Sequence, residues 1–138
     1  MHARVKWIEG LQFLGETGSG HALLMDAAVE AGGANLGPRP MELLLIGAAG
    51  CSGIDVVNML KKGHQNVKGC VVEIEAERAQ QDPKVFTRIH FHYVVSGRSL
   101  RPDRVERAIR LSAEKYCSAS IMLGKTATLT QDFELTDA

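Results

Sequence analysis

The sequence has few aromatic residues and no excess of charge of either sign. Phe, Trp and Tyr make up 5% of the 138 residues, so the core has to be built from aliphatic side chains. Lys and Arg together number 16, Asp and Glu together number 16, and the formal net charge is zero. A chain without net charge has no long-range attraction for nucleic acid or for an anionic membrane surface. We therefore expect neither nucleic acid nor membrane among its partners.

The N-terminus lacks the uninterrupted apolar stretch of a signal peptide or a membrane span. The first ten residues, MHARVKWIEG, alternate charged and apolar side chains. We therefore expect a cytoplasmic protein. A length of 138 residues suits one domain, which we expect to cover residues 1–138.

Cysteine is also scarce, and its spacing is not that of a metal site. The three cysteines form no CxxC pair and no Cys/His pattern typical of zinc ligands, so we expect no metal and no cofactor. Purely structural disulfides are rare in a reducing cytoplasm. Any pairing among these cysteines is therefore more typical of catalysis or redox sensing.

The distribution of apolar residues predicts an α+β fold without βαβ repeats. Short strands joined by glycine-containing turns are expected up to about residue 26, followed by a loop over residues 27–38. A long helix is expected to begin at Pro40 and to end near Lys62, closed by Gly63. The remaining expected elements are strands over 67–79 and 85–96, a helix over 103–117, a short helical segment over 118–123 and a strand over 126–135. In the second of these strands, alternation places Ile89, Phe91, Tyr93 and Val95 on the buried face and His90 and His92 on the polar one. In the helix over 103–117, one stripe carries Val105, Ile109, Ser112 and Tyr116, and the opposite side carries Arg104 and Arg107.

The long helix is unusual because its centre is apolar or small on nearly every side. The run from Leu43 to Gly53 contains three glycines, each of which costs about 1 kcal/mol relative to alanine inside a helix. A helix that is apolar all round has to be covered on all sides, and close approach of another backbone explains the glycines. We therefore predict an antiparallel sheet wrapped around a long buried central helix, with a second subunit completing an intertwined homodimer.

Two of the cysteines have surroundings that suggest chemistry. Cys51 lies in the middle of the predicted central helix, and Cys117 lies 66 residues later at the end of the second helix. On a regular helix Asp55 and Asn58 share the face of Cys51, which places a thiol beside polar groups in an apolar element. Cys70 falls inside a strand, where a cysteine is most simply a small buried apolar residue, and the same reading is open for the other two.

A reactive cysteine has to be a thiolate, which requires a nearby cation or hydrogen-bond donor. Cys51 is eleven residues beyond Pro40, so the dipole of its own helix gives little help, and a charged Asp55 would oppose ionisation. Arg39 precedes the helix, and Glu42 is placed to orient its guanidinium. A solvated loop charge and a carboxylate favouring the helix dipole are equally open interpretations of this pair. The alternative candidates for this cation are His21, His64, His90 and His92.

Several of these features together resemble a known family. Pro40 with Glu42, the run LLLIGAAGCS ending at Cys51 and Ser52, and SAEKYCS around Cys117 resemble the OsmC/Ohr family of osmotically inducible and organic-hydroperoxide-resistance proteins, most of all its YhfA-like branch. The resemblance covers essentially the whole chain, since the order of strands and helices also matches.

The resemblance implies an intertwined α+β homodimer that reduces organic hydroperoxides with a dithiol as reductant. By this similarity Cys51 corresponds to the peroxidatic cysteine and Cys117 to the resolving one. The peroxidase members carry a Pro-Glu pair, whereas Met41 separates Pro40 from Glu42 here. They also carry an arginine near the N-terminal strands, whereas residues 8–38 contain neither Lys nor Arg. The cation that activates Cys51 is therefore expected to be Arg39 or a residue of the partner chain.

Two functions of different classes remain open from the sequence. The first is a thiol-dependent peroxidase in oxidative stress defence. The second is a non-catalytic binder of a small ligand, or a thiol redox sensor, on the same fold.

Overall fold

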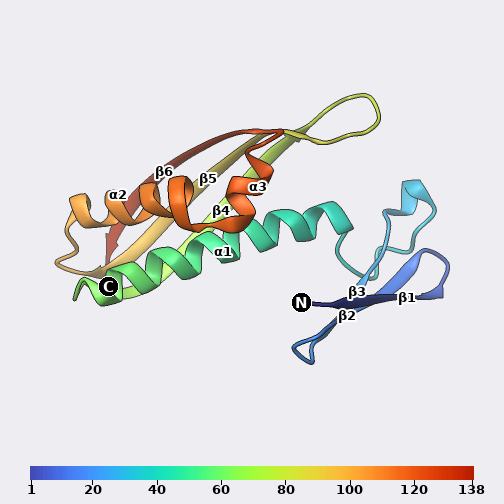
Figure 1. Cartoon of the computed structure of the whole chain (residues 1–138), viewed down its shortest axis with the longest axis horizontal. Helices are drawn as coiled ribbons and strands as arrows, with labels where there is room; N and C mark the ends of the chain where they lie inside the picture. Colours follow the sequence, from blue (N-terminus) through green and yellow to red (C-terminus); the bar gives the residue numbers. More distant parts are fainter. The chain divides into compact units, whose positions relative to one another are not determined.

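A computed structural model describes all residues from 1 to 138, and they form two compact units (Figure 1). The first unit covers Met1–Leu45 and the second covers Ile46–Ala138. The long helix α1 (Pro40–Lys62) begins in the first unit and continues into the second. A single functional domain over 1–138 stays a prediction.

The first unit is an antiparallel sheet followed by a loop. Its strands are β1 (Ala3–Glu9), β2 (Gln12–Thr17) and β3 (Ala22–Met25), in the order β1-β2-β3. The predicted loop contains only one short turn of helix, η1 (Val29–Ala31). Asp26 is 2% exposed and accepts backbone N–H groups from three positions along this loop, Ala27, Ala34 and Leu36. Burial by itself raises the pKa of Asp26, but these three hydrogen bonds outweigh it and hold that pKa below its usual value.

Helix α1 has the bounds that the sequence predicts, from Pro40 to Lys62. Gly63 follows it as expected, but the left-handed backbone conformation falls one residue later, on His64, at φ 59°. The predicted end of the helix before Gly63 is therefore confirmed, but His64 rather than the glycine adopts the left-handed conformation.

The second unit contains a second three-stranded sheet, in the order β4-β5-β6. The strands β4 (Asn66–Arg78) and β5 (Phe86–Arg98) form a long antiparallel hairpin, as predicted. Strand β6 (Thr128–Asp137) pairs with β5 in parallel, so antiparallel pairing does not extend to this last strand. Parallel neighbours require a crossover connection, and the helical residues between β5 and β6 provide it.

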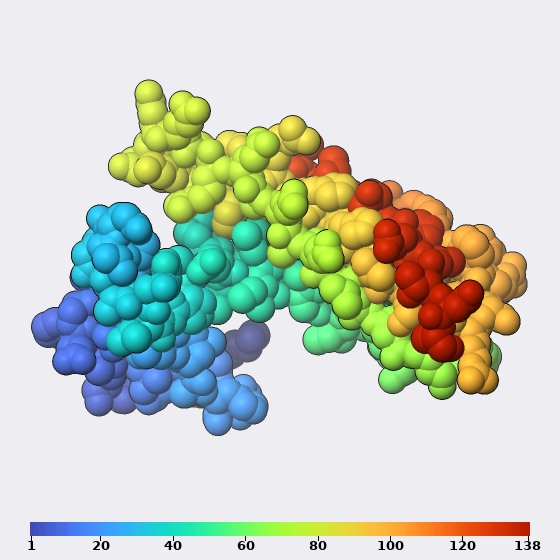
Figure 2. Space-filling model, turned by 180° about the vertical axis from the view of Figure 1, so that it is seen from behind, coloured from blue at the N-terminus to red at the C-terminus, as the bar shows by residue number.

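One face of the second sheet is buried by helices, and the other is open. Side chains at alternate positions of β5 are buried, as predicted, namely Ile89, Phe91, Tyr93 and Val95. Figure 1 shows the helices of this unit on one side of the sheet. In Figure 2 the strands, coloured yellow-green to yellow and red, lie at the molecular surface on the other side.

The expected helix over 103–117 is two segments. The first is α2 (Pro102–Leu111), and the second is a π-helical segment, η2 (Ser112–Tyr116), followed by α3 (Ser118–Leu123). A π turn holds more residues than an α turn, so it rotates the residues that follow it. Val105, Ile109 and Ser112 are buried as expected, whereas Tyr116, expected on the same stripe, is 51% exposed.

Helix α1 is only partly covered within one chain. Four of its side chains are buried, those of Ala48, Ser52, Val56 and Leu60. Ile46 is 60% exposed and Ile54 is 71% exposed, so the all-round burial that we expected is absent from the single chain. By length and composition α1 could cross a membrane, a test that the core helix of a soluble protein also passes.

Candidate functional site

The fold of the second unit brings two of the three cysteines together beside a carboxylate. The Sγ atoms of Cys51 and Cys117 and a carboxylate oxygen of Asp55 all lie within 4.8 Å of one another. Cys51 and Asp55 are one turn apart on α1, as the helical spacing predicts. Cys117 joins them from the start of α3, because η2 ends just before it. We call these three residues the thiol site.

The two thiols have different environments. Cys51 is half-buried, whereas Cys117 is 0% exposed. Burial raises the pKa of the Cys117 thiol, although the Ser120 hydroxyl and backbone N–H act in the opposite direction. The Ser120 N–H donates to Cys117 Sγ at 3.4 Å, and the Ser120 hydroxyl lies 3.0 Å from the same sulfur. Solvent therefore reaches the site at Cys51 rather than at Cys117.

A buried chain of hydroxyl groups leads to Asp55. The Tyr93 Oη lies 2.6 Å from Ser52 Oγ, which lies 2.9 Å from Ser112 Oγ. The Ser112 hydroxyl donates to Asp55 Oδ2 at 3.1 Å. Ser52, Tyr93 and Ser112 are at most 2% exposed, so each depends on the others for its polar partner.

Sequence reasoning missed that these hydroxyl groups form a hydrogen-bonded chain to Asp55. Tyr93 and Ser112 were both placed correctly on buried faces, but as core residues. The signal that could have found them is a hydroxyl group on each of two otherwise apolar stripes, because a buried hydroxyl needs a partner.

A cavity of about 510 Å³ lies next to the thiol site, between α1 and α2. Asp55 and Asn58 line it from α1, and Arg104 and Arg107 line it from α2. Sequence reasoning placed both arginines on the solvent side of their helix. Both are exposed, as that placement predicts, and they also line, from the same chain, a cavity that reaches Asp55.

Arg39 and Glu42 both form hydrogen bonds at the start of α1. The guanidinium of Arg39 donates to Asn35 Oδ1 at 2.9 Å and to the Gly37 carbonyl at 3.0 Å. The backbone N–H of Arg39 donates to Glu42 Oε1 at 2.8 Å, which is half of a capping box. An activating or orienting role of this pair at Cys51 stays a prediction.

Cys70 is separate from the thiol site. It lies half-buried on β4 and lines an open groove together with α1 residues such as Gly50 and Ile54. Burial raises the pKa of its thiol, which favours the unreactive protonated form.

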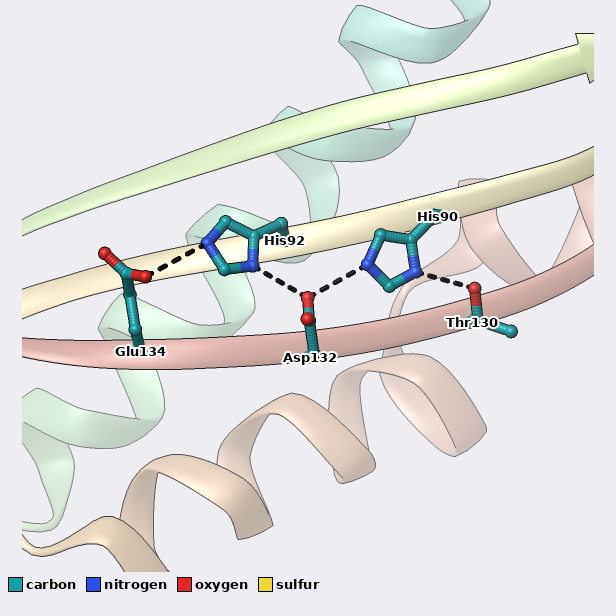
Figure 3. A network of polar contacts seen from close by, with 5 residues as sticks. All are labelled: His90, His92, Thr130, Asp132 and Glu134. Atoms are coloured by element: carbon teal, nitrogen blue, oxygen red, sulfur yellow. Dashed lines mark hydrogen bonds and ion pairs between the residues drawn. The ribbon is translucent and has the colours of Figure 1, made fainter.

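Two of the histidines considered as alternative cations form a cluster on the open face of the second sheet (Figure 3). Asp132 Oδ1 lies 2.9 Å from His90 Nε2 and 2.7 Å from His92 Nδ1. The remaining ring nitrogens contact Thr130 Oγ1 at 2.7 Å and Glu134 Oε2 at 3.6 Å, respectively. Because His90 and His92 alternate with buried Phe91 and Tyr93, they point away from the thiol site.

The fold and the thiol site together define a class of protein: a small α+β protein whose long central helix presents a cysteine to a second cysteine that follows a later helix. The family model for OsmC-like protein matches residues 32–132. The protein YhfA of Escherichia coli K12 is 49% identical over 138 residues, with 100% of both chains covered. The chain belongs to the OsmC-like family.

Solved structures agree with this assignment. A hypothetical protein from Aquifex aeolicus is 31% identical, with a TM-score of 0.87 over 99% of this chain and 96% of the other. The organic hydroperoxide resistance protein OhrB of Bacillus subtilis has a TM-score of 0.65 over 97% and 98% of the two chains. At 17% identity, the likeness to OhrB shows a shared fold alone.

Proposed function

We propose that the chain is a thiol-dependent peroxidase that reduces organic hydroperoxides, with Cys51 as the peroxidatic cysteine and Cys117 as the resolving cysteine. The observation that carries the proposal is the approach of the two sulfurs to within 4.8 Å, with Cys51 solvent-accessible and Cys117 fully buried. A disulfide needs an S–S distance of about 2.05 Å, so the two sulfurs have to approach further during the condensation.

The proposed reaction has three steps. The Cys51 thiolate attacks the terminal peroxide oxygen, the O–O bond breaks, and the alkoxide leaves as the alcohol after taking a proton. Cys51 is then a sulfenic acid, which condenses with the Cys117 thiol to form a disulfide and one water molecule. A dithiol reductant returns both cysteines to thiols and is itself oxidised to a disulfide.

The activation of Cys51 is the most demanding part of this proposal. The Asp55 carboxylate repels the negative charge of a thiolate, so a cation has to offset it. Arg39, oriented by Glu42, remains our candidate from the sequence, together with a residue of a partner chain. Arg104 and Arg107 are further candidates for this cation within the second unit, since both residues line the cavity that reaches Asp55.

The proposal is tested with the full-length protein, reduced and freed of metal with a chelator. Cumene hydroperoxide should be consumed, and mass spectrometry should find a Cys51–Cys117 disulfide. Cys51→Ser should abolish consumption. Cys117→Ser should allow one turnover and leave a sulfenic acid that dimedone traps at Cys51.

Cys70→Ser is the matched control, because Cys70 is a half-buried thiol outside the thiol site. It should react as the wild type does. If the reduced protein leaves the peroxide unconsumed while Cys51 and Cys117 remain thiols, the chain is not a peroxidase.

A second candidate function is a non-catalytic binder of a small ligand, or a thiol redox sensor. Two observations favour it: a carboxylate rather than a cation directly beside the thiols, and the 510 Å³ cavity lined by Asp55. A binder would retain its ligand irrespective of Cys51→Ser. A sensor would oxidise once without turnover in the presence of a dithiol.

We also propose a homodimer located in the cytoplasm. A groove along α1 and β4 is lined mainly by apolar residues, including Ile46, Ile54, Val57 and Val72. A side chain added at Gly47 or Gly50 would meet no atom within 4 Å apart from the adjoining backbone of α1 itself, so packing within the chain does not explain these glycines. Packing of a second α1 against this face explains both the glycines and the exposed isoleucines.

A further inference from the structure

The thiol site has the donor set of a soft divalent metal ion. Thiolates are ligands that zinc and related ions prefer, and a carboxylate completes such sets. Zinc binds sulfur at about 2.3 Å and carboxylate oxygen at about 2.0–2.2 Å, so two donors of one tetrahedral ion lie roughly 3.4–3.8 Å apart. The three donor atoms of Cys51, Asp55 and Cys117 already lie within 4.8 Å of one another. Shortening the distances between donor atoms by at most about 1.4 Å closes the difference.

The charges at this site also suit a cation. Once both thiols have lost their protons to bind a metal, two thiolates and a carboxylate amount to three negative charges. None of the ion pairs in the structure involves Asp55. A divalent ion would neutralise most of this charge at the point where the three donors converge. It would do so within the second unit alone, since all three donors belong to that unit.

The donors are held by a surrounding shell of hydrogen bonds, as metal ligands usually are. The Ser112 hydroxyl donates to Asp55 Oδ2 and is itself held by Ser52. The Ser120 N–H fixes Cys117 Sγ from the first turn of α3. These partners are 0% to 3% exposed, so they are part of the core and keep the donors in place.

We propose that Cys51, Asp55 and Cys117 form a binding site for a thiophilic divalent cation of the zinc class. Asp55 also lines the 510 Å³ cavity, which gives water or another small ligand access to a fourth position. The bound metal engages both sulfurs and thereby shields them from oxidation. This last consequence rests on the proposed peroxidase function, whereas the binding itself does not.

The first experiment measures binding without any peroxide. Reduced, metal-free full-length protein is titrated with Cd²⁺ alone, and the ultraviolet thiolate-to-cadmium charge-transfer band is followed. We expect one equivalent to bind. The band should be lost in Cys51→Ser and in Cys117→Ser and kept in Cys70→Ser, and Asp55→Asn or Ser112→Ala should weaken the affinity about 10–100-fold.

The histidine cluster of Figure 3 is the competing site in the same chain. Its donors are imidazole nitrogens and carboxylates, which give no thiolate band. His90→Ala combined with His92→Ala should therefore leave the band and its titration unchanged. A thiolate band that survives in Cys51→Ser, or binding as tight in Asp55→Asn as in the wild type, would overturn the three-donor assignment.

A second measurement avoids substitutions that unfold the protein. X-ray absorption on the zinc-loaded wild type should show two sulfur neighbours at about 2.3 Å and oxygen or nitrogen neighbours at about 2.0–2.2 Å. A shell without sulfur would overturn the proposal. Peroxide consumption, measured separately, should fall on adding one equivalent of Zn²⁺ and recover with chelator. If metal binds but metal-free protein consumes no peroxide, only the proposed function fails.

Discussion

Asp132 contacts two histidines with a single oxygen atom. Its Oδ1 lies within 3 Å of both His90 Nε2 and His92 Nδ1, on the open face of the second sheet. The hydrogen bond to Asp132 raises the pKa of His92 above its ordinary value of 6.5, and nearby Glu134 and Glu73 add to this. In return, the bond to His92 lowers the pKa of Asp132 below its ordinary value of 3.8. The protonated histidine and the ionised aspartate therefore stabilise the folded state together.

These two shifts predict a pH window for stability. The raised pKa of His92 contributes stability that is complete below pH 6.5 and is lost as the pH rises through its folded-state pKa. The lowered pKa of Asp132 contributes stability that is complete above pH 3.8 and is lost as the pH falls through its folded-state pKa. Asp132→Asn should therefore lower the melting temperature most between pH 3.8 and 6.5, with the difference from wild type shrinking above this range.

Asp137→Asn is the matched control for this pH dependence. Asp137 lies on the same strand, is exposed and takes part in no ion pair. Melting curves of the wild type and this variant should run parallel from pH 3.8 to 8. A loss of stability in Asp132→Asn that is equal at pH 5 and pH 8 would refute the coupling.

Residue pairs of this kind set a limit on sequence-based prediction. The alternation along β5 places His90 and His92 on the open face, and the structure agrees. Their partner Asp132 comes from β6, which pairs with β5 in parallel, and we expected antiparallel pairing. A pattern within one strand indicates on which face of the sheet each side chain lies. It does not indicate which other strand a crossover connection places beside it.

At the scale of elements, the helical stretch before Cys117 shows the same limit. The bounds of α1 follow from Pro40, Gly63 and the apolar residues between them, all of which are local signals. No such local signal in the sequence marks the π-helical segment η2. This segment nevertheless turns Tyr116 toward solvent, and it ends just before Cys117, the N-cap residue of α3. The approach of Cys117 to Cys51 could therefore be predicted from family resemblance, but not from helical periodicity.

The start of α1 offers a test of whether Glu42 stabilises the helix or orients a catalytic group. Its Oε1 accepts the Arg39 N–H at the first turn. Glu42→Ala removes this acceptor and should lower the free energy of unfolding in urea by about 1 kcal/mol. Glu42→Gln keeps an acceptor at the same place and should lose only a few tenths of a kcal/mol.

Peroxide consumption by the same two variants separates the two roles. If Glu42 orients the Arg39 guanidinium toward Cys51, Glu42→Gln should be nearly as stable as the wild type and yet clearly slower. Equal rates of peroxide consumption by Glu42→Gln and the wild type would show that Glu42 only caps the helix. Arg104 and Arg107 would then be the remaining candidates within the chain for the cation that activates Cys51.

At the scale of the whole molecule, the uncovered face of α1 is the main unexplained feature of the single chain. Ile54 is 71% exposed and lines the groove along β4 with other apolar side chains. Large exposed apolar patches mark interaction surfaces, and a two-fold dimer uses one such patch twice. A charge placed at Ile54 would be buried without a partner in each half of that interface, at high cost.

Ile54→Glu should therefore convert the proposed dimer to a monomer, as measured by light scattering on size-exclusion chromatography. Val71→Glu is the matched control, because Val71 is an aliphatic residue that is 54% exposed on the open face of the same sheet. It should leave the mass unchanged. A wild-type protein that elutes as a monomer at all concentrations would exclude the dimer. A dimer that survives Ile54→Glu but dissociates in Val71→Glu would move the interface from the α1 groove to the open face of the sheet, where Asp132 and its two histidines lie.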